Sequence, residues 1–219
     1  MTLQMGLVVS TLAFVGLHFL LSHPLRAPLV ARIGEGPFQG VYSLIALVTF
    51  GLMIHFYSAI GREPQLWVAG DTLWLLASLL MWFGSILFVG SFAGNPALPG
   101  ARGPRGGAPS GVFAITRHAM MWGFASWAIV HLIVVGTPKA LVFDGALLFL
   151  ALVGSVGQDA KKRRLMGGRW HEWTAQTAFW PFARGLKSPG AFALVGGTLL
   201  FFGATWLHPI RAGFWRWIG

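Results

Sequence analysis

Three histidines interrupt long apolar stretches of this sequence: His18, His55 and His131. Ionisable side chains are costly within a bilayer, so they usually face the interior of a helix bundle and mark a functional site. A neutral imidazole has two ordinary roles in that setting, a hydrogen bond between helices or a bond to a metal complex that brings its own counter-charge. Three such residues in one small bundle favour a bound cofactor.

The residue types that are missing narrow the choice of cofactor. No carboxylate accompanies the three histidines at depth, which weighs against proton-relay chains, Ser-His-Asp hydrolysis and carboxylate-bound metals. The chain has no cysteine, which excludes iron–sulfur clusters, thiolate-bound zinc and covalently attached haem. Haem b fits what is left, because its macrocycle is apolar, its iron accepts one or two imidazoles and its propionates pair with arginine near the membrane surface.

Helical spacing predicts an aromatic ring beside one of these histidines. Gly123, Trp127 and His131 follow one another at intervals of four residues, so they share one face of a helix. The glycine leaves room on that face, and the indole packs next to the imidazole. We therefore expect Trp127 to belong to the cofactor site.

Depth along the expected helices leaves the pairing of the histidines open. At about 1.5 Å per residue, His55 lies level with His131, whereas His18 lies near the membrane edge, level with His118. His118 comes thirteen residues before His131, so the two face different sides of one helix. Together with Arg117, His118 forms a polar pair at the membrane surface, which we expect to meet an anionic group.

The elements that must position these side chains are apolar helices. Of the 219 residues, 55% are hydrophobic and only 10% are charged, far from the composition of a soluble domain. A helix needs roughly 20 apolar residues to cross a bilayer. Six stretches approach that length, which predicts an all-α, polytopic membrane helix bundle of about six transmembrane helices in a single domain, 1–219: residues 3–21, 38–60, 72–92, 119–135, 140–157 and 191–207.

The distribution of Lys and Arg predicts the orientation of the bundle. The loops after the first, third and fifth expected helices hold 12 of the 16 basic residues. By the positive-inside rule these loops are cytoplasmic and both termini lie on the other side, which predicts a multi-pass membrane protein; in a bacterium this means the inner membrane with periplasmic termini. Topology and anionic lipid headgroups account for the net charge of +10, so membrane lipids are expected partners and nucleic acid is not.

Two of the expected cytoplasmic segments differ from ordinary short loops. Residues 93–116 are rich in Gly and Pro and include Arg102 and Arg105, which predicts either a flexible connector or a lid that holds an anionic group. Residues 158–188 combine a basic cluster with aromatic rings, which is typical of an anchor at the lipid headgroups; these rings include Trp170, Trp173, Phe179 and Trp180.

Four motifs follow one another over nearly the whole chain: H-F-L-L-S-H-P-L-R (18–26), I-G-E-G-P-F-Q-G-V-Y-S-L (33–44), T-R-H-A-M-M-W-G-F-A-S-W-A-I-V-H (116–131) and G-x-x-W-x-x-W-x-x-x-T-x-x-x-P-F (167–182). In this order they resemble the NnrU family, which is related to 15-cis-zeta-carotene isomerase. The block at 116–131 is the most specific of the four.

The resemblance implies a polytopic membrane protein that holds haem b, with His18 and His131 as its axial ligands. It also implies either a redox or nitric oxide role linked to denitrification, or an isomerase-like activity on a lipophilic polyene. The sequence departs from the isomerase branch at Ala128, where that branch has a cysteine, and at Ala119, where a proline is usual. Chemistry that depends on the thiolate is therefore excluded.

A more distant resemblance points to a different class of enzyme. R-H-x-x-x-x-G (117–123), an acidic residue and the P-F ending are similar to membrane methyltransferases of the isoprenylcysteine carboxyl type. Those enzymes bind S-adenosylmethionine at the cytoplasmic face, where Arg117 and His118 are expected; Asp159 is the nearest acid. A third hypothesis is a non-enzymatic accessory subunit of a larger membrane complex, in which the histidines only connect helices.

Overall fold

The computed structural model describes residues 2–98 and 107–218. Within these two stretches the secondary structure consists of helices, and no strand occurs. The prediction of an all-α fold is confirmed. Arg102 and Arg105, predicted to contact an anionic group, lie outside the described residues.

Each of the six predicted apolar stretches forms a helix. These are α1 (Leu3–Ser22), α3 (Glu35–Ala59), α4 (Asp71–Gly90), α6 (Ala119–Val135), α7 (Pro138–Met166) and α9 (Ala191–Trp206). Four of them, α1, α3, α4 and α7, are long and apolar enough to cross a membrane, so the chain is a helical membrane protein. At 17 and 16 residues, α6 and α9 extend only about 25 Å, less than the roughly 30 Å of the hydrocarbon core.

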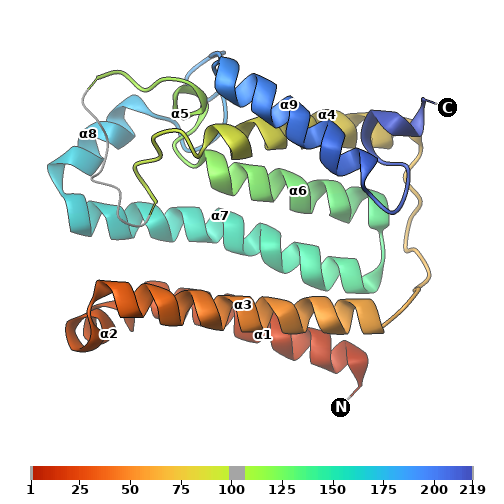
Figure 1. Ribbon diagram of the computed structural model, residues 1–219, viewed down its shortest axis with the longest axis horizontal. Coiled ribbons are helices and arrows are strands. Elements are labelled where there is room, and N and C mark those ends of the chain that lie inside the picture. Colours follow the sequence, from red (N-terminus) through yellow and green to blue (C-terminus); the bar gives the residue numbers. More distant parts are fainter. Residues whose placement is uncertain (1, 99–106, 219) are drawn as a thin grey trace.

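The long helices lie side by side in a row (Figure 1). Helix α4 packs against both α6 and α9, α6 packs against α7, and α7 is followed by a layer formed by α1 and α3. Both chain termini lie at the same end of the helices, on the right in Figure 1. We refer to the opposite end, where α8 (Gly168–Gln176) lies, as the α8 end.

Small residues bring α4 close to its neighbours. A Cβ atom on Gly84 of α4 would lie 2.6 Å from Cβ of Ser126 on α6, and one on Gly123 would lie 2.9 Å from Cβ of Phe88. Gly197 of α9 meets the backbone of Ile86 in the same way. Close backbone approach is the usual function of small residues between membrane helices. Gly123 therefore makes room for α4, so a neighbouring helix fills the space expected on that face of α6.

The connection between α6 and α7 is a two-residue turn that makes these helices antiparallel. Gly136 ends α6 in the left-handed conformation, with φ 58°, where a side chain would also meet the carbonyl oxygen of Trp67 at 2.8 Å. Thr137 then caps α7, and Pro138 occupies its first turn. This turn fixes how α6 and α7 lie next to each other.

The α8 end is more ordered than the sequence predicts. Helix α7 continues through the basic cluster to Met166, so the predicted cytoplasmic segment 158–188 begins as helix. Trp170 and Trp173 of α8 are buried against Phe113 of the short helix α5 (Val112–Ile115). Helix α8 is amphipathic, and its apolar face packs on the apolar side chains of α5. The prediction that these two rings anchor the chain in lipid is wrong, whereas Trp180 is exposed.

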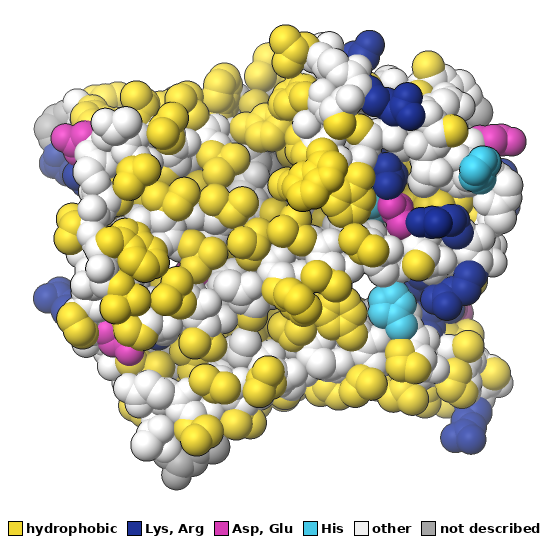
Figure 2. All heavy atoms as spheres, turned by 180° about the vertical axis from the view of Figure 1, so that it is seen from behind, with side chains coloured by type: hydrophobic (Ala, Val, Ile, Leu, Met, Phe, Trp, Pro, Cys, Tyr) yellow, Lys and Arg dark blue, Asp and Glu magenta, His cyan; other side chains and the backbone are white. Residues whose placement is uncertain are grey.

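The surface has the composition of a membrane-embedded bundle. Apolar side chains cover the middle of the face shown in Figure 2, and Lys and Arg gather toward the α8 end. Short helix α2 (Arg26–Ile33) lies at that end, and the 3₁₀ turn η1 (Gly213–Arg216) packs on α4 and α9.

Candidate functional site

His131 lies near the end of α6, and its ring is held in one orientation. Its Nδ1 atom donates a hydrogen bond to the carbonyl oxygen of Trp127, 2.8 Å away and one turn earlier. The indole of Trp127 stacks on the imidazole with ring centres 4.0 Å apart, so the predicted contact between these two rings is confirmed. Because a carbonyl only accepts, this bond puts the proton on Nδ1 and leaves a lone pair on Nε2.

A cavity of about 130 Å³ lies in front of His131, between α4, α6, α9 and the segment before η1. We call it the His131 cavity. Its walls are mostly apolar, and a second imidazole, that of His208, faces it with a ring centre 6.3 Å from that of His131. Other side chains that line it are Trp74, Met81, Trp127, Phe201 and Thr205. Two imidazole rings therefore face the same apolar cavity.

His18 of α1 has the same local geometry as His131. Its Nδ1 lies 2.7 Å from the carbonyl oxygen of Phe14, one turn earlier, which again leaves Nε2 as the acceptor. The ring packs between Phe14 and Tyr42, with ring centres 4.3 and 5.4 Å away. His18 thus has a free lone pair in an aromatic environment.

The structure does not bring His18 and His131 to one site. Each lies four residues before the end of its helix, but α1 and α6 run in opposite directions and α7 lies between them (Figure 1). His55, the other predicted partner, is exposed on α3. In this arrangement neither residue shares an iron with His131.

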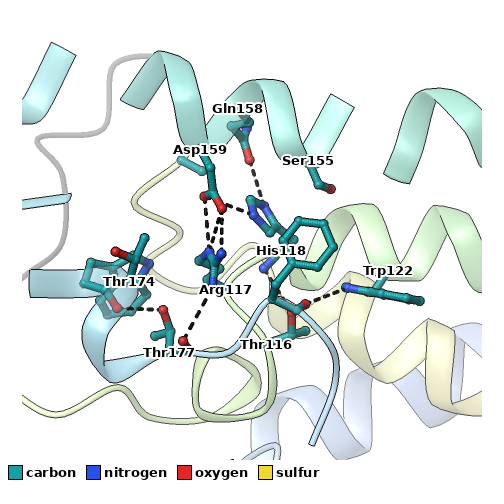
Figure 3. A network of polar contacts seen from close by, with 12 residues as sticks. Thr116, Arg117, His118, Trp122, Ser155, Gln158, Asp159, Thr174 and Thr177 are labelled. Carbon is teal, nitrogen blue, oxygen red and sulfur yellow. Dashed lines mark hydrogen bonds and ion pairs between the residues drawn. The ribbon is translucent and has the colours of Figure 1, made fainter. Parts of the chain in front are cut away.

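The start of α6 holds a second cluster, which we call the Arg117 network: Arg117, His118, Gln158 and Asp159 (Figure 3). Arg117 donates to Asp159 through Nε and Nη2, at 2.9 and 2.6 Å from Oδ2. His118 Nε2 lies 3.1 Å from Oδ1 of the same carboxylate, and its Nδ1 lies 3.2 Å from the side-chain oxygen of Gln158. His118 and Asp159 are buried, so α6 and α7 are joined by a charged cluster shielded from solvent.

The segment after α8 completes this cluster. The guanidinium carbon of Arg117 lies 5.4 Å from the centre of the Phe179 ring. The carbonyl oxygen of Phe179 accepts hydrogen bonds from Thr116 Oγ1 at 2.7 Å and from Trp122 Nε1 at 2.9 Å. The start of α6 is therefore tied to α7 and to residues 177–179.

A cavity of about 190 Å³ adjoins the Arg117 network. It lies between the start of α6, Gln158 of α7 and residues 95–98, and Arg117, His118, Met120 and Met121 line it. Within the described residues, neither this cavity nor the His131 cavity gathers three or more His, Cys, Asp or Glu side chains that could hold a bare metal ion.

Comparison with protein families assigns the chain to a group. The family model described as NnrU protein matches residues 6–215. The chain belongs to the NnrU family. Comparison with curated proteins and with solved structures found no match.

Sequence reasoning about this NnrU family member missed His208 and did not predict the partners of Asp159. His208 lies two residues after the last apolar helix, and only the packing of the helices shows that it faces His131 of α6. Asp159 lies 42 residues after Arg117. The distant methyltransferase resemblance named Asp159 as the nearest acid but did not pair it with His118.

Proposed function

We propose that this protein binds haem b in the membrane, and that the Nε2 atom of His131 would hold its iron. The observation that carries the proposal is the orientation of His131: the Trp127 carbonyl holds Nδ1, while Nε2 has no hydrogen-bond partner within the described residues and its ring lines an apolar cavity. A metal-bound histidine typically donates its other nitrogen in this way. The match to the NnrU family supports the same proposal.

The residue types that line the His131 cavity suit a haem. Haem iron needs only one or two protein nitrogens, and the cavity supplies those of His131 and His208 among apolar walls. The two ring centres lie 6.3 Å apart in the structure, and Nδ1 of His208 accepts a hydrogen bond from the backbone N–H of Ile210. His131 is therefore the better oriented of the two imidazoles for a bond to iron.

The volume of the cavity sets a condition on binding. Ligand sites for molecules of drug size usually enclose about 300 Å³ or more, whereas this cavity encloses about 130 Å³. Binding of a whole porphyrin therefore requires the His208 segment, residues 207–212, to move away from α6. That segment lies outside the helices, and it is joined to the end of α9 by a hydrogen bond from Leu207 N–H to the carbonyl oxygen of Gly203.

We further propose a redox or nitric oxide role in the bacterial inner membrane, with both termini periplasmic. Bound haem would supply one-electron chemistry or a binding position for a diatomic gas. We prefer this role to polyene isomerisation because Ala128 offers no thiolate. The greater number of basic residues at the α8 end supports the orientation.

An absorption spectrum with a pyridine haemochrome assay tests the proposal, using protein made with ample haem supply. We expect a Soret band in the parent chain. His131→Ala should lower haem content by about tenfold or more, since loss of even an outer-shell partner can cost that much. His208→Ala should change the spectrum, whereas His18→Ala should do so only if His18 holds a separate haem.

His55→Ala is the matched control, because it also removes an imidazole from an apolar helix but lies on the exposed face of α3. A colourless parent without iron would contradict the proposal and favour an accessory subunit. Equal haem content in all four variants would show that the ligands lie elsewhere.

A methyltransferase is the second candidate, favoured by the cavity beside Arg117 and His118. The charge of Arg117 is already neutralised, since two of its guanidinium nitrogens donate to Asp159, which leaves it poorly suited to hold the carboxylate of S-adenosylmethionine. Calorimetry in lipid nanodiscs decides between the candidates. Saturable binding of S-adenosylmethionine that is lost in Gln158→Ala would favour the methyltransferase.

A further inference from the structure

Two lysines of α7, at the α8 end, have no anionic partner. Lys162 is buried, with 7% of its surface exposed, and Lys161 is half-buried. Within the described residues neither side chain makes a hydrogen bond or an ion pair. An ammonium group that gives up most of its water needs hydrogen-bond acceptors in return. The two lysines therefore have an unmet requirement for a negatively charged group.

Other basic groups surround these two lysines. His23, at the end of α1, lies over α7, because a Cβ atom on Gly157 would be 2.5 Å from its Nε2 atom. Burial, and then the charges of Lys161 and Arg164, hold the pKa of His23 below its usual value. The charge of Arg26, where α2 begins, acts on both lysines. We call the place where α7 passes the α1–α2 turn the basic junction: His23, Arg26, Lys161, Lys162 and Arg164.

The carboxylates near the basic junction already have partners. Glu35 of α3 acts on both lysines, but it accepts two hydrogen bonds from Arg26 Nη2, at 2.6 and 2.8 Å, and one from Gln39 at 3.0 Å. Asp159, one turn earlier in α7, is held by the Arg117 network. Glu35 therefore balances one of the four Lys and Arg charges of the junction and leaves the others without a counter-charge.

The basic junction lies at the depth of lipid headgroups. At about 1.5 Å per residue, Lys161 is about 35 Å along α7 from Pro138, where the helix begins. The hydrocarbon core of a bilayer is about 30 Å thick, so the lysines lie just beyond it. On the membrane side of the junction, Phe149, Val153 and Val156 are exposed at intervals of four and three residues, on one face of α7. An acyl chain therefore has an apolar surface to follow from the junction into the bilayer.

We propose that the basic junction binds the phosphate group of an anionic membrane lipid, with Lys161 and Lys162 as donors to its oxygens. Lysine suits a phosphate because its compact ammonium group carries three donors. The phosphate supplies the acceptors that Glu35 and Asp159 already give to other residues. The acyl chains lie along the exposed apolar face of α7. The junction is at the α8 end and the His131 cavity is near the opposite end of α6, so lipid binding here does not depend on haem.

Thermal unfolding in detergent micelles with added lipid tests this site. The anionic lipid dioleoylphosphatidylglycerol should raise the unfolding temperature of the parent chain, because it binds the folded state. Dioleoylphosphatidylcholine, which has the same acyl chains and no net charge, should raise it much less. Lys161→Met/Lys162→Met should weaken the apparent affinity for the anionic lipid by about tenfold or more, as expected for lost hydrogen bonds to charged groups. Arg163→Gln, the matched control, removes an exposed charge next to Lys162 and should change the affinity much less.

The double methionine variant also separates lipid binding from a structural role of the lysines. Without lipid it should be at least as stable as the parent, because it removes two unpaired positive charges and keeps most of each apolar stem. A lower unfolding temperature without lipid would overturn the proposal, as would equal effects of the two lipids or equal affinities in the parent and both variants. Inorganic phosphate, added at constant ionic strength, should have little effect. Stabilisation by phosphate as large as that by the anionic lipid would overturn the assignment to a lipid and favour a soluble phosphate compound.

Discussion

At the start of α6, His118 lies beside Asp159 and Gln158, whereas near its end His131 has one backbone partner and faces a cavity. The two imidazoles are thirteen residues apart in the same helix. At the first, the polar groups bond to one another, and the cluster joins α6, α7 and residues 177–179. At His131, the lone pair of Nε2 has no partner within the described residues and is available to a ligand.

The difference teaches that two similar residues in one apolar helix need separate interpretations. Removing one partner of a buried ion pair lowers the stability of the fold strongly, because the other charge is then left uncompensated. An imidazole nitrogen with a lone pair beside a cavity contributes little to the stability of the fold and is free to bind a ligand. We therefore assign the Arg117 network to positioning and the His131 cavity to function, and the predictions below test that division.

The largest effect is expected from Asp159→Ala in the Arg117 network. The substitution leaves the Arg117 guanidinium buried without its carboxylate, at a side-chain exposure of 13%, which should lower the free energy of unfolding by about 3–5 kcal/mol. Unfolding in detergent micelles, followed by circular dichroism, measures it. The double variant Arg117→Met/Asp159→Leu should be clearly more stable than Asp159→Ala. A double variant as unstable as the single one would contradict the role of charge compensation.

The sequence predicted the helices well because their signal is local. Six apolar stretches became six helices, and for 119–135 even the ends agree. The stacking of Trp127 on His131 was also predictable, since residues four apart share a helix face. Contacts within one helix depend on spacing alone.

The long-range pairs were beyond sequence reasoning. His131 faces His208 because of the way the chain returns after α9, and Arg117 meets Asp159 because α6 and α7 pack in one particular register. The depth arithmetic did indicate that His18 and His131 lie at different levels, but it could not show that α7 separates them. Charge and hydropathy patterns specify depth in the membrane and say little about which helix lies beside which.

A smaller effect is expected where the Arg117 network meets residues 177–179. The Phe179 carbonyl accepts from both Thr116 and Trp122, so Thr116→Val or Trp122→Phe alone should lower the free energy of unfolding by about 1 kcal/mol. The combined variant leaves the carbonyl without either donor and should cost more than the sum of the single variants. The same unfolding measurement on all four proteins closes this double-mutant cycle. Simple additivity would show that the carbonyl finds another donor.

The smallest effect on stability is expected at the His131 cavity. Ala204 lines it from α9 and is exposed, so Ala204→Leu adds a side chain at the cavity without overpacking the core. The haem-free protein should change in stability by less than about 0.5 kcal/mol, as is usual for exposed positions. Haem occupancy at limiting haem should nevertheless fall, because the added side chain competes for the same space. A variant that loses stability but keeps its haem would reverse the division between the two ends of α6, since the cavity would then be structural.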